Sequence, residues 1–343
     1  MGQMVYNVNE SATQVLAAKQ VKENTFLDLV HKNGYGVTQQ EETNASTIRM
    51  MKVSPITDDA RQLGASNNGA WFAAGAIGTP KVVEYDLNLL YIYDKPIDIP
   101  EVQEDMVPVN VMDNTTKNIG GRVATEINAS TLALQLMEKY NAAKTATKWD
   151  GIAVVLTSNG DVYNAVQTAS TMLDDGDEAN GIQSFPFAER QILMRPTFRA
   201  SLLSSKGVLL GGSNYAQSML AKGAVSPEAR KEWGNMYCGE IDGIPCYIVP
   251  SALWNRAGAW TGNATAFAAT EAIVCAASAT DRGISTQDYI KIIDSPEGAG
   301  KRLQPKTRWG VNVCYPKGII PILKSGTAAP SANLTVMAVG SQA

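Results

Sequence analysis

The chain has 343 residues, enough to bury a large core, and its 45% apolar and 18% charged residues are typical of a globular protein. A net charge of −4 excludes the strongly basic proteins that coat nucleic acid. A shell that only encloses nucleic acid needs no such charge, so that class of protein stays open.

The first 44 residues are expected to form an arm. Apolar residues recur with a helical period from about Ser11 to Lys32, and Asn33-Gly34 ends this pattern.

An extended strand, a loose tip and a return are expected next. Ser46 to Ile56 can form a strand, and the tip up to Pro80 is rich in glycine, alanine and asparagine. Trp71 and Phe72 lie in the middle of this tip. Two interpretations stay open: these aromatic residues are buried on a neighbouring chain, or the loop folds back onto its own core.

Alternating residues from Lys81 to Tyr93 predict a long strand with one buried face. Ile92 falls on its more polar face. The strand leads into Pro96-Ile-Asp-Ile-Pro100-Glu101, and a helical pattern of about 30 residues follows up to Ala146, which corresponds to roughly 45 Å. We expect an apolar stripe along this helix, interrupted by Ser130, with five polar residues off the stripe: Arg122, Glu126, Gln135, Glu138 and Lys139.

Shorter elements are expected to follow. Strands are predicted at 152–156, 191–195, 208–210, 244–249, 272–276, 289–293, 310–315 and 318–323, with a possible edge strand at 334–338. Helices are predicted at 162–172, 197–203, 215–220 and 227–233.

The residues that catalysis or metal binding would need are scarce. His31 is the single histidine, which excludes a multi-histidine metal site and leaves little for general base chemistry. The four cysteines form no C-x-x-C pair, and each stands in an apolar context, as buried free thiols do. Gly300-Lys301 lacks the spacing of a phosphate-binding loop. We therefore expect no enzyme, no cofactor and no metal site.

A basic cluster lies in nine residues near the end of the chain. It contains Lys301, Arg302, Lys306 and Arg308. We favour a solvated face or ion pairs between subunits over a nucleic-acid contact. With no signal peptide or membrane-spanning segment found, we expect a soluble protein made in the cytoplasm.

The order of the predicted elements along the chain, together with several short motifs, resembles the major capsid proteins of tailed phages. These proteins have the Hong Kong 97-type fold, which encapsulin shells share. Gly239-Glu-Ile-Asp-Gly-Ile-Pro-Cys-Tyr-Ile-Val-Pro250 is similar to that family's G-x-I-x-G-I-P-V hairpin, which a short Pro/Ser/Leu stretch follows. Ala272-Ile-Val-Cys-Ala276 and Tyr315-Pro-Lys-Gly-Ile-Ile320 resemble its late closing strands.

The resemblance implies an α+β chain with a defined division into domains. The N-terminal arm would be 1–44, the extended β-hairpin loop 45–84 and the axial domain 147–270. The peripheral domain would combine 85–146 with 271–328 around a spine helix at 115–146, and 329–343 would form a C-terminal tail. The short arm implies that no scaffolding domain is fused to the chain.

The function that the resemblance implies is self-assembly into an icosahedral virion capsid that encloses double-stranded DNA. Expected partners are further copies of the chain in pentamers and hexamers, a portal and a separate scaffolding protein, without sequence-specific DNA binding and without a membrane. Lys81 would be a possible cross-link donor, because some members join subunits through lysine and asparagine. The inter-subunit contact candidates are Trp71, Phe72, Lys81, Lys301, Arg302, Lys306 and Arg308.

Two alternatives stay open. An encapsulin-type compartment would use the same fold to hold a cargo enzyme. The strand–turn–helix unit at 152–169 could instead belong to an α/β enzyme, which would need a pocket with converging ionisable groups.

Overall fold

The computed structural model describes eleven segments of the chain. They are residues 13, 15–21, 47–53, 82–88, 91–100, 111–158, 161–204, 236–262, 267–284, 290–294 and 300–335. The elements expected at 208–210, 215–220 and 227–233, and the edge strand at 334–338 beyond residue 335, lie outside these segments.

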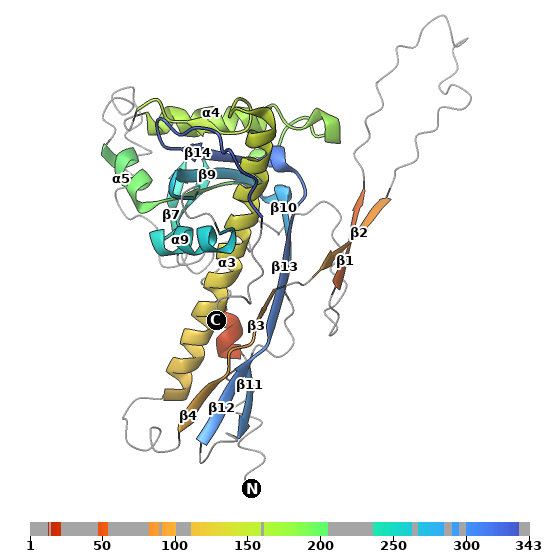
Figure 1. The fold of residues 1–343 in the computed structure, drawn as a ribbon, viewed down its shortest axis with the longest axis vertical. Helices are drawn as coiled ribbons and strands as arrows, with labels where there is room; N and C mark the ends of the chain where they lie inside the picture. Colours follow the sequence, from red (N-terminus) through yellow and green to blue (C-terminus); the bar gives the residue numbers. More distant parts are fainter. Residues whose placement is uncertain are drawn as a thin grey trace, which may run out of the picture.

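The longest element is α3, which spans Val111–Ala146 and, with 36 residues, measures about 54 Å (Figure 1). The long helix expected at 115–146 is confirmed and begins four residues earlier than predicted. Ile119, Val123 and Ile127 are buried, as the apolar stripe predicted.

Burial on α3 extends well beyond one stripe, and here the prediction was wrong. Glu126, Gln135 and Lys139, expected off the stripe, are all buried. The reason is that α9 (Ser251–Trp260), β13 (Thr307–Val313) and β14 (Ile319–Leu323) all contact the helix. A helix covered by several elements buries polar side chains together with apolar ones.

A long two-part ribbon lies along the lower half of α3 (Figure 1). In one three-stranded sheet, β13 lies between β10 (Thr280–Ile284) and β3 (Tyr91–Tyr93). In the other, β12 (Gly300–Pro305) lies between β11 (Ile290–Asp294) and β4 (Ile97–Pro100). Because β12 runs almost directly into β13, the two sheets follow one another along a single chain segment.

The long strand predicted over 81–93 is divided in the structure. Its first part, β2 (Val82–Asn88), pairs antiparallel with β1 (Thr47–Val53), whereas β3 pairs with β13. The two parts therefore have different partners, which an alternating pattern alone does not reveal. The β1–β2 pair stands to one side of the body and confirms the expected strand after Ser46 (Figure 1).

A six-stranded mixed sheet forms the upper body, in the order β5-β14-β9-β6-β8-β7. Its remaining strands are β5 (Val154–Val155), β6 (Arg190–Met194), β7 (Tyr237–Ile241), β8 (Ile244–Ile248) and β9 (Thr270–Ala276). The helices α4 (Val162–Asp174) and α5 (Pro196–Ser204) lie in the same body (Figure 1). Hydrogen bonds from β9 to β6 cross the boundary expected at residue 270, and the division into domains stays a prediction.

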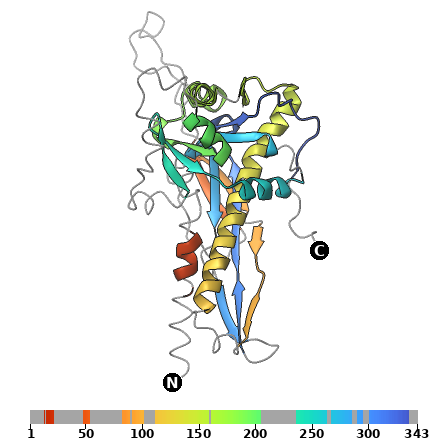
Figure 2. The ribbon, with the colours of Figure 1, turned by 90° about the vertical axis from the view of Figure 1, so that its left-hand side faces the viewer.

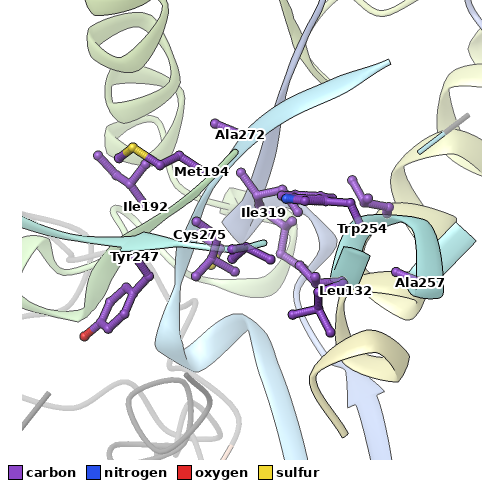
Figure 3. Close-up of a cluster of buried hydrophobic side chains, with 14 of the residues drawn as sticks. Leu132, Ile192, Met194, Tyr247, Trp254, Ala257, Ala272, Cys275 and Ile319 are labelled. Atoms are coloured by element: carbon purple, nitrogen blue, oxygen red, sulfur yellow. The ribbon is translucent and has the colours of Figure 1, made fainter. Parts of the chain in front are cut away.

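One continuous core joins α3 to this sheet. Figure 3 shows side chains from α3, α9, β14 and β9 in it, among them Leu132, Trp254, Ile319 and Cys275, all of them fully buried. No helix was predicted at the position of α9, whose Leu253, Trp254, Ala257 and Trp260 are buried with a helical period.

The predicted hairpin at 239–250 is confirmed as β7 and β8. Asp242 and Gly243 form its two-residue turn, both with positive φ (51° and 80°), as a type I′ turn requires. The Tyr163 hydroxyl of α4 lies 2.9 Å from both carboxylate oxygens of Asp242 and donates to them, which holds the turn against the helix.

The described part of the arm packs on α3. Thr13, Ala17 and Val21 are buried with a spacing of four residues, and Figure 2 shows this short helix beside the lower half of α3. The helices approach closely at Gly120, where an added Cβ would lie 2.8 Å from the Gln20 Cβ and 3.2 Å from the Ala17 carbonyl oxygen.

Gly120 and Gly121 provide a matched test of this contact. Alanine stabilises a helix interior by about 1 kcal/mol relative to glycine, so both Gly→Ala changes carry the same intrinsic gain. Gly121 has no atom within 4 Å of an added Cβ, so G121A should increase the free energy of unfolding by up to about 1 kcal/mol. G120A should lose that gain and expose the arm, as measured by urea unfolding and limited proteolysis. Equal unfolding free energies and equal proteolysis rates of the two variants would contradict the contact between the arm and α3.

Candidate assembly surfaces

The basic cluster lies on β12, on β13 and between them, where residues alternate between two faces. Leu303, Thr307 and Trp309 are buried, whereas Lys306 and Arg308 are exposed and Arg302 is half-buried. Period-two alternation therefore places three of the four predicted residues on the outward side. Lys301, on the alternate set, is half-buried and pairs in register with Ile99 and Asp294.

Arg302 has an ion pair within its own chain. Its Nε lies 2.5 Å from Asp98 Oδ1 and its Nη2 lies 2.6 Å from Asp98 Oδ2, in a bidentate arrangement across β12 and β4. These hydrogen bonds hold the pKa of the Asp98 carboxyl below its usual value. Among the described residues, Lys306 and Arg308 make no ion pair, so they are the cations of the cluster that a partner can engage.

An exposed isoleucine accompanies these cations. Ile92 is 48% exposed and is the register partner of Arg308 on β3. We call the surface formed by Ile92, Asp98, Arg302, Lys306 and Arg308 the outer ribbon face. The sequence contained a signal for Ile92, because this apolar residue falls on the polar face of the alternating pattern, but we did not select it as a site residue.

The other face of the ribbon is fixed to α3. Trp309 Nε1 donates to Ser130 Oγ at 2.9 Å, and both residues are buried. Ser130, which interrupts the predicted apolar stripe, is thus the partner of a buried indole. This contact determines which face of the ribbon points outward.

A buried carboxylate fixes α9 to the same helix. Glu126 accepts hydrogen bonds from Arg256 Nε at 3.0 Å and from Trp260 Nε1 at 3.2 Å, and its second cation, Arg122, lies at 2.9 Å. Two guanidinium groups and an indole donor compensate the desolvation of this carboxylate.

The other predicted contact residues, Trp71, Phe72 and Lys81, lie outside the described residues, as does His31. Their roles stay predictions.

The described residues offer little for catalysis. Burial raises the pKa of the Cys238 thiol to about 11 and that of Cys275 to about 12, so both thiols stay protonated at neutral pH. No group of three potential metal ligands occurs in the described part of the chain. Within the same residues, no helix has the length and hydropathy to cross a membrane.

Lys139 is a buried amine where α3 meets two connecting segments. It is 3% exposed, and burial, together with the charge of Lys317, lowers its pKa to about 7, while Asp177 acts in the opposite direction. Lys317 Nζ lies 3.1 Å from Asp177 Oδ1.

Comparison with known proteins gives matches at the level of structure. No family model matches the chain, and no curated protein matches it. A solved structure from Mycobacterium phage Che8 matches with a TM-score of 0.50 and 14% identity, over 87% of this chain and 90% of that chain.

The chain has the Hong Kong 97-type fold.

Two further structures have lower TM-scores. The mature capsid of bacteriophage PhiM1 matches at 0.49 with 13% identity, over 83% of this chain and 84% of that chain. A virus-like particle from Pyrococcus furiosus matches at 0.45 with 12% identity, over 91% of this chain and 98% of that chain.

The predicted α+β class and the Hong Kong 97-type fold are confirmed. In this fold α3 is the spine helix. The outer ribbon face is the surface of the ribbon that α3 leaves uncovered.

Replacing Lys139 tests the pH dependence of folding. An unfolded lysine holds its proton up to about pH 10.4, whereas folded Lys139 releases it near pH 7, so folding releases a proton between these values. The free energy of unfolding should therefore rise with pH above 7, by about 1–2 kcal/mol up to pH 8.5, where the unfolded thiols begin to ionise and oppose it. K139M should flatten this rise in urea unfolding measured from pH 6 to 8.5. K117M, at an exposed position of the same helix, is the control and should leave the rise unchanged. A K139M profile as steep as that of the unmodified protein would contradict the assignment.

Proposed function

We propose that this chain is a major capsid protein that self-assembles into an icosahedral shell enclosing phage double-stranded DNA. The observation that carries the proposal is the Hong Kong 97-type fold, because the families that the sequence resembles use it to build closed shells. The role proposed is structural rather than catalytic.

The shape of the subunit supports assembly in physical terms. The β1–β2 pair lies to one side of the main body (Figure 1). On the outer ribbon face, an isoleucine is exposed together with two cations that form no ion pair with any described residue. Burial of such surfaces on further copies provides a favourable free energy that an isolated subunit lacks. Heterologous contacts that close around rotation axes then generate rings, here pentamers and hexamers.

The remaining parts of the proposal follow from this role. The chain would be made in the host cytoplasm, would assemble with a portal and a separate scaffolding protein, and would end in the virion capsid. Packaged DNA would be enclosed without sequence-specific contacts, consistent with the net charge of −4.

The contact candidates divide into two sets in this proposal. Trp71, Phe72 and Lys81 would lie over an adjacent subunit. Lys306 and Arg308 would form ion pairs across an interface, with Lys301 and Arg302 beside them.

Aromatic burial between subunits is tested by W71S combined with F72S. We expect a folded subunit that forms no particles in negative-stain micrographs, because the large apolar area is lost from the interface only. W71F with F72Y keeps the aromatic area and should still form particles. Normal particles from the serine variant would mean that the loop folds back on its own subunit.

Charge reversal tests the outer ribbon face. K306E with R308E should reduce particle yield at low salt, while unfolding of the isolated subunit shifts by less than about 0.5 kcal/mol, because both side chains are exposed. K117E, a single charge reversal at an exposed position of α3, is the control for charge reversal outside this face. An unchanged yield across 50 to 500 mM salt would remove this face from the assembly contacts.

A further inference from the structure

The last described segment returns to the core at Leu334 after a largely exposed stretch, in which Ala329 packs partly buried against the core. Following β14, the chain turns at Gly326, whose φ is +75°, and Thr327 N donates to the Lys324 carbonyl oxygen at 3.2 Å. Residues 328–333 are exposed or half-buried, whereas Leu334 is 4% exposed and joins the main core.

One side chain of α3 recognises the backbone of this buried leucine. Asn141 Nδ2 donates to the Leu334 carbonyl oxygen at 3.0 Å, and Leu334 N donates to Asn141 Oδ1 at 2.8 Å. An asparagine amide that binds both polar groups of one residue reproduces the pairing of a neighbouring strand. We call Asn141 and the core position of Leu334 the tail site.

The part of α3 that carries Asn141 is held in place by contacts that do not involve the tail. Tyr140, next to Asn141, stacks on Phe267 with ring centroids 6.4 Å apart and meets Trp149 edge-on at 5.2 Å. Its hydroxyl lies 3.2 Å from Thr270 Oγ1. This end of α3 is therefore positioned by residues other than the tail, and the site does not require the tail for its geometry.

Recognition at the tail site depends on little of the tail's sequence. The Asn141 amide binds the backbone N–H and C=O of Leu334, and the core accepts one apolar side chain, while the neighbouring Asn333 is exposed. Such a site combines affinity from main-chain hydrogen bonds with specificity from one side chain.

We propose that the tail site is a docking site for the C-terminal segment of any copy of this chain, so that neighbouring subunits can exchange tails. The ten Cα-to-Cα steps from Lys324 to Leu334 span at most about 35 Å. In a single subunit, the subunit's own tail occupies the tail site because the covalent link gives that tail a high effective concentration there. In a shell, neighbouring copies would supply competing tails at a similar effective concentration. Only this exchange within a shell rests on the proposed function, because the docking site itself exists in the single subunit.

The experiment uses the full chain with its own tail disabled. L334D should vacate the tail site, because a carboxylate is not accommodated in an apolar core. A fluorescent peptide of residues 326–343 is then titrated and its anisotropy measured. We expect saturable binding to L334D and at least a tenfold loss of affinity when N141L is added. T145A on L334D is the matched receptor control, one helical turn along, and should bind like L334D.

Peptide variants separate the two parts of recognition. The peptide with Leu334→Ala should bind at least tenfold more weakly, and the peptide with Asn333→Ala should bind within twofold of the original. No saturable binding up to 1 mM, or binding unaffected by N141L, would overturn the proposal.

A second measurement avoids dependence on the folding of L334D. In the unmodified chain, the Leu334 amide is hydrogen-bonded to Asn141 and should exchange slowly with solvent. Several millimolar peptide should displace the tail and accelerate this exchange, and an unchanged rate would overturn the proposal. Neither readout requires particles, so a failure to assemble would count against the proposed function alone.

Discussion

The structure depends on covering one long helix from several directions while satisfying the polar groups buried with it. Glu126, Ser130 and Gln135 lie within three turns of α3, and each hydrogen-bonds a different element: α9, β13 and β10, respectively. A buried polar group without its partner costs about 1–3 kcal/mol, so a slide or rotation of α3 would carry several such penalties. These contacts fix both α9 and the ribbon relative to the helix.

This constraint also explains the exposed surface of the lower half. A sheet with a helix on only one face leaves its other face to solvent or to a partner. Trp309 and Leu303 fill the covered face of the ribbon, and period-two alternation then places Arg308 and Ile92 outside. The outer ribbon face thus follows from the same packing that stabilises the subunit.

The two ends of the described chain are both attached to α3, each through a small local contact. The arm lies against Gly120, where the absence of a side chain permits close approach, and the tail is bound by Asn141. Neither contact is part of a sheet, although Ala17 and Leu334 are buried in the core. Attachments of this size can form and open without unfolding the body, which suits segments that connect subunits.

Local patterns in the sequence were sufficient to predict several elements. The helix of α3 followed from a long apolar period, and the hairpin at 239–250 from its resemblance to a family motif. The basic cluster was recognised because four cations lie within nine residues, whereas its alternation around Leu303 was found only in the structure. The order of these motifs also indicated the Hong Kong 97-type fold. Periodicity is a property of residues close together in the sequence, so it can be recognised without knowledge of the tertiary structure.

Tertiary contacts alone decided the burial of Glu126, Gln135 and Lys139, the division of the strand at 81–93, and the role of Asn141. A hydrophobic pattern reports the strongest apolar face of a helix but not how many layers cover it. The partners also lie far away in sequence, 134 residues for Glu126 and Trp260 and 193 for Asn141 and Leu334. The sequence by itself therefore determined which elements form, and the packing of distant segments determined which polar residues became structural and which surfaces remained open.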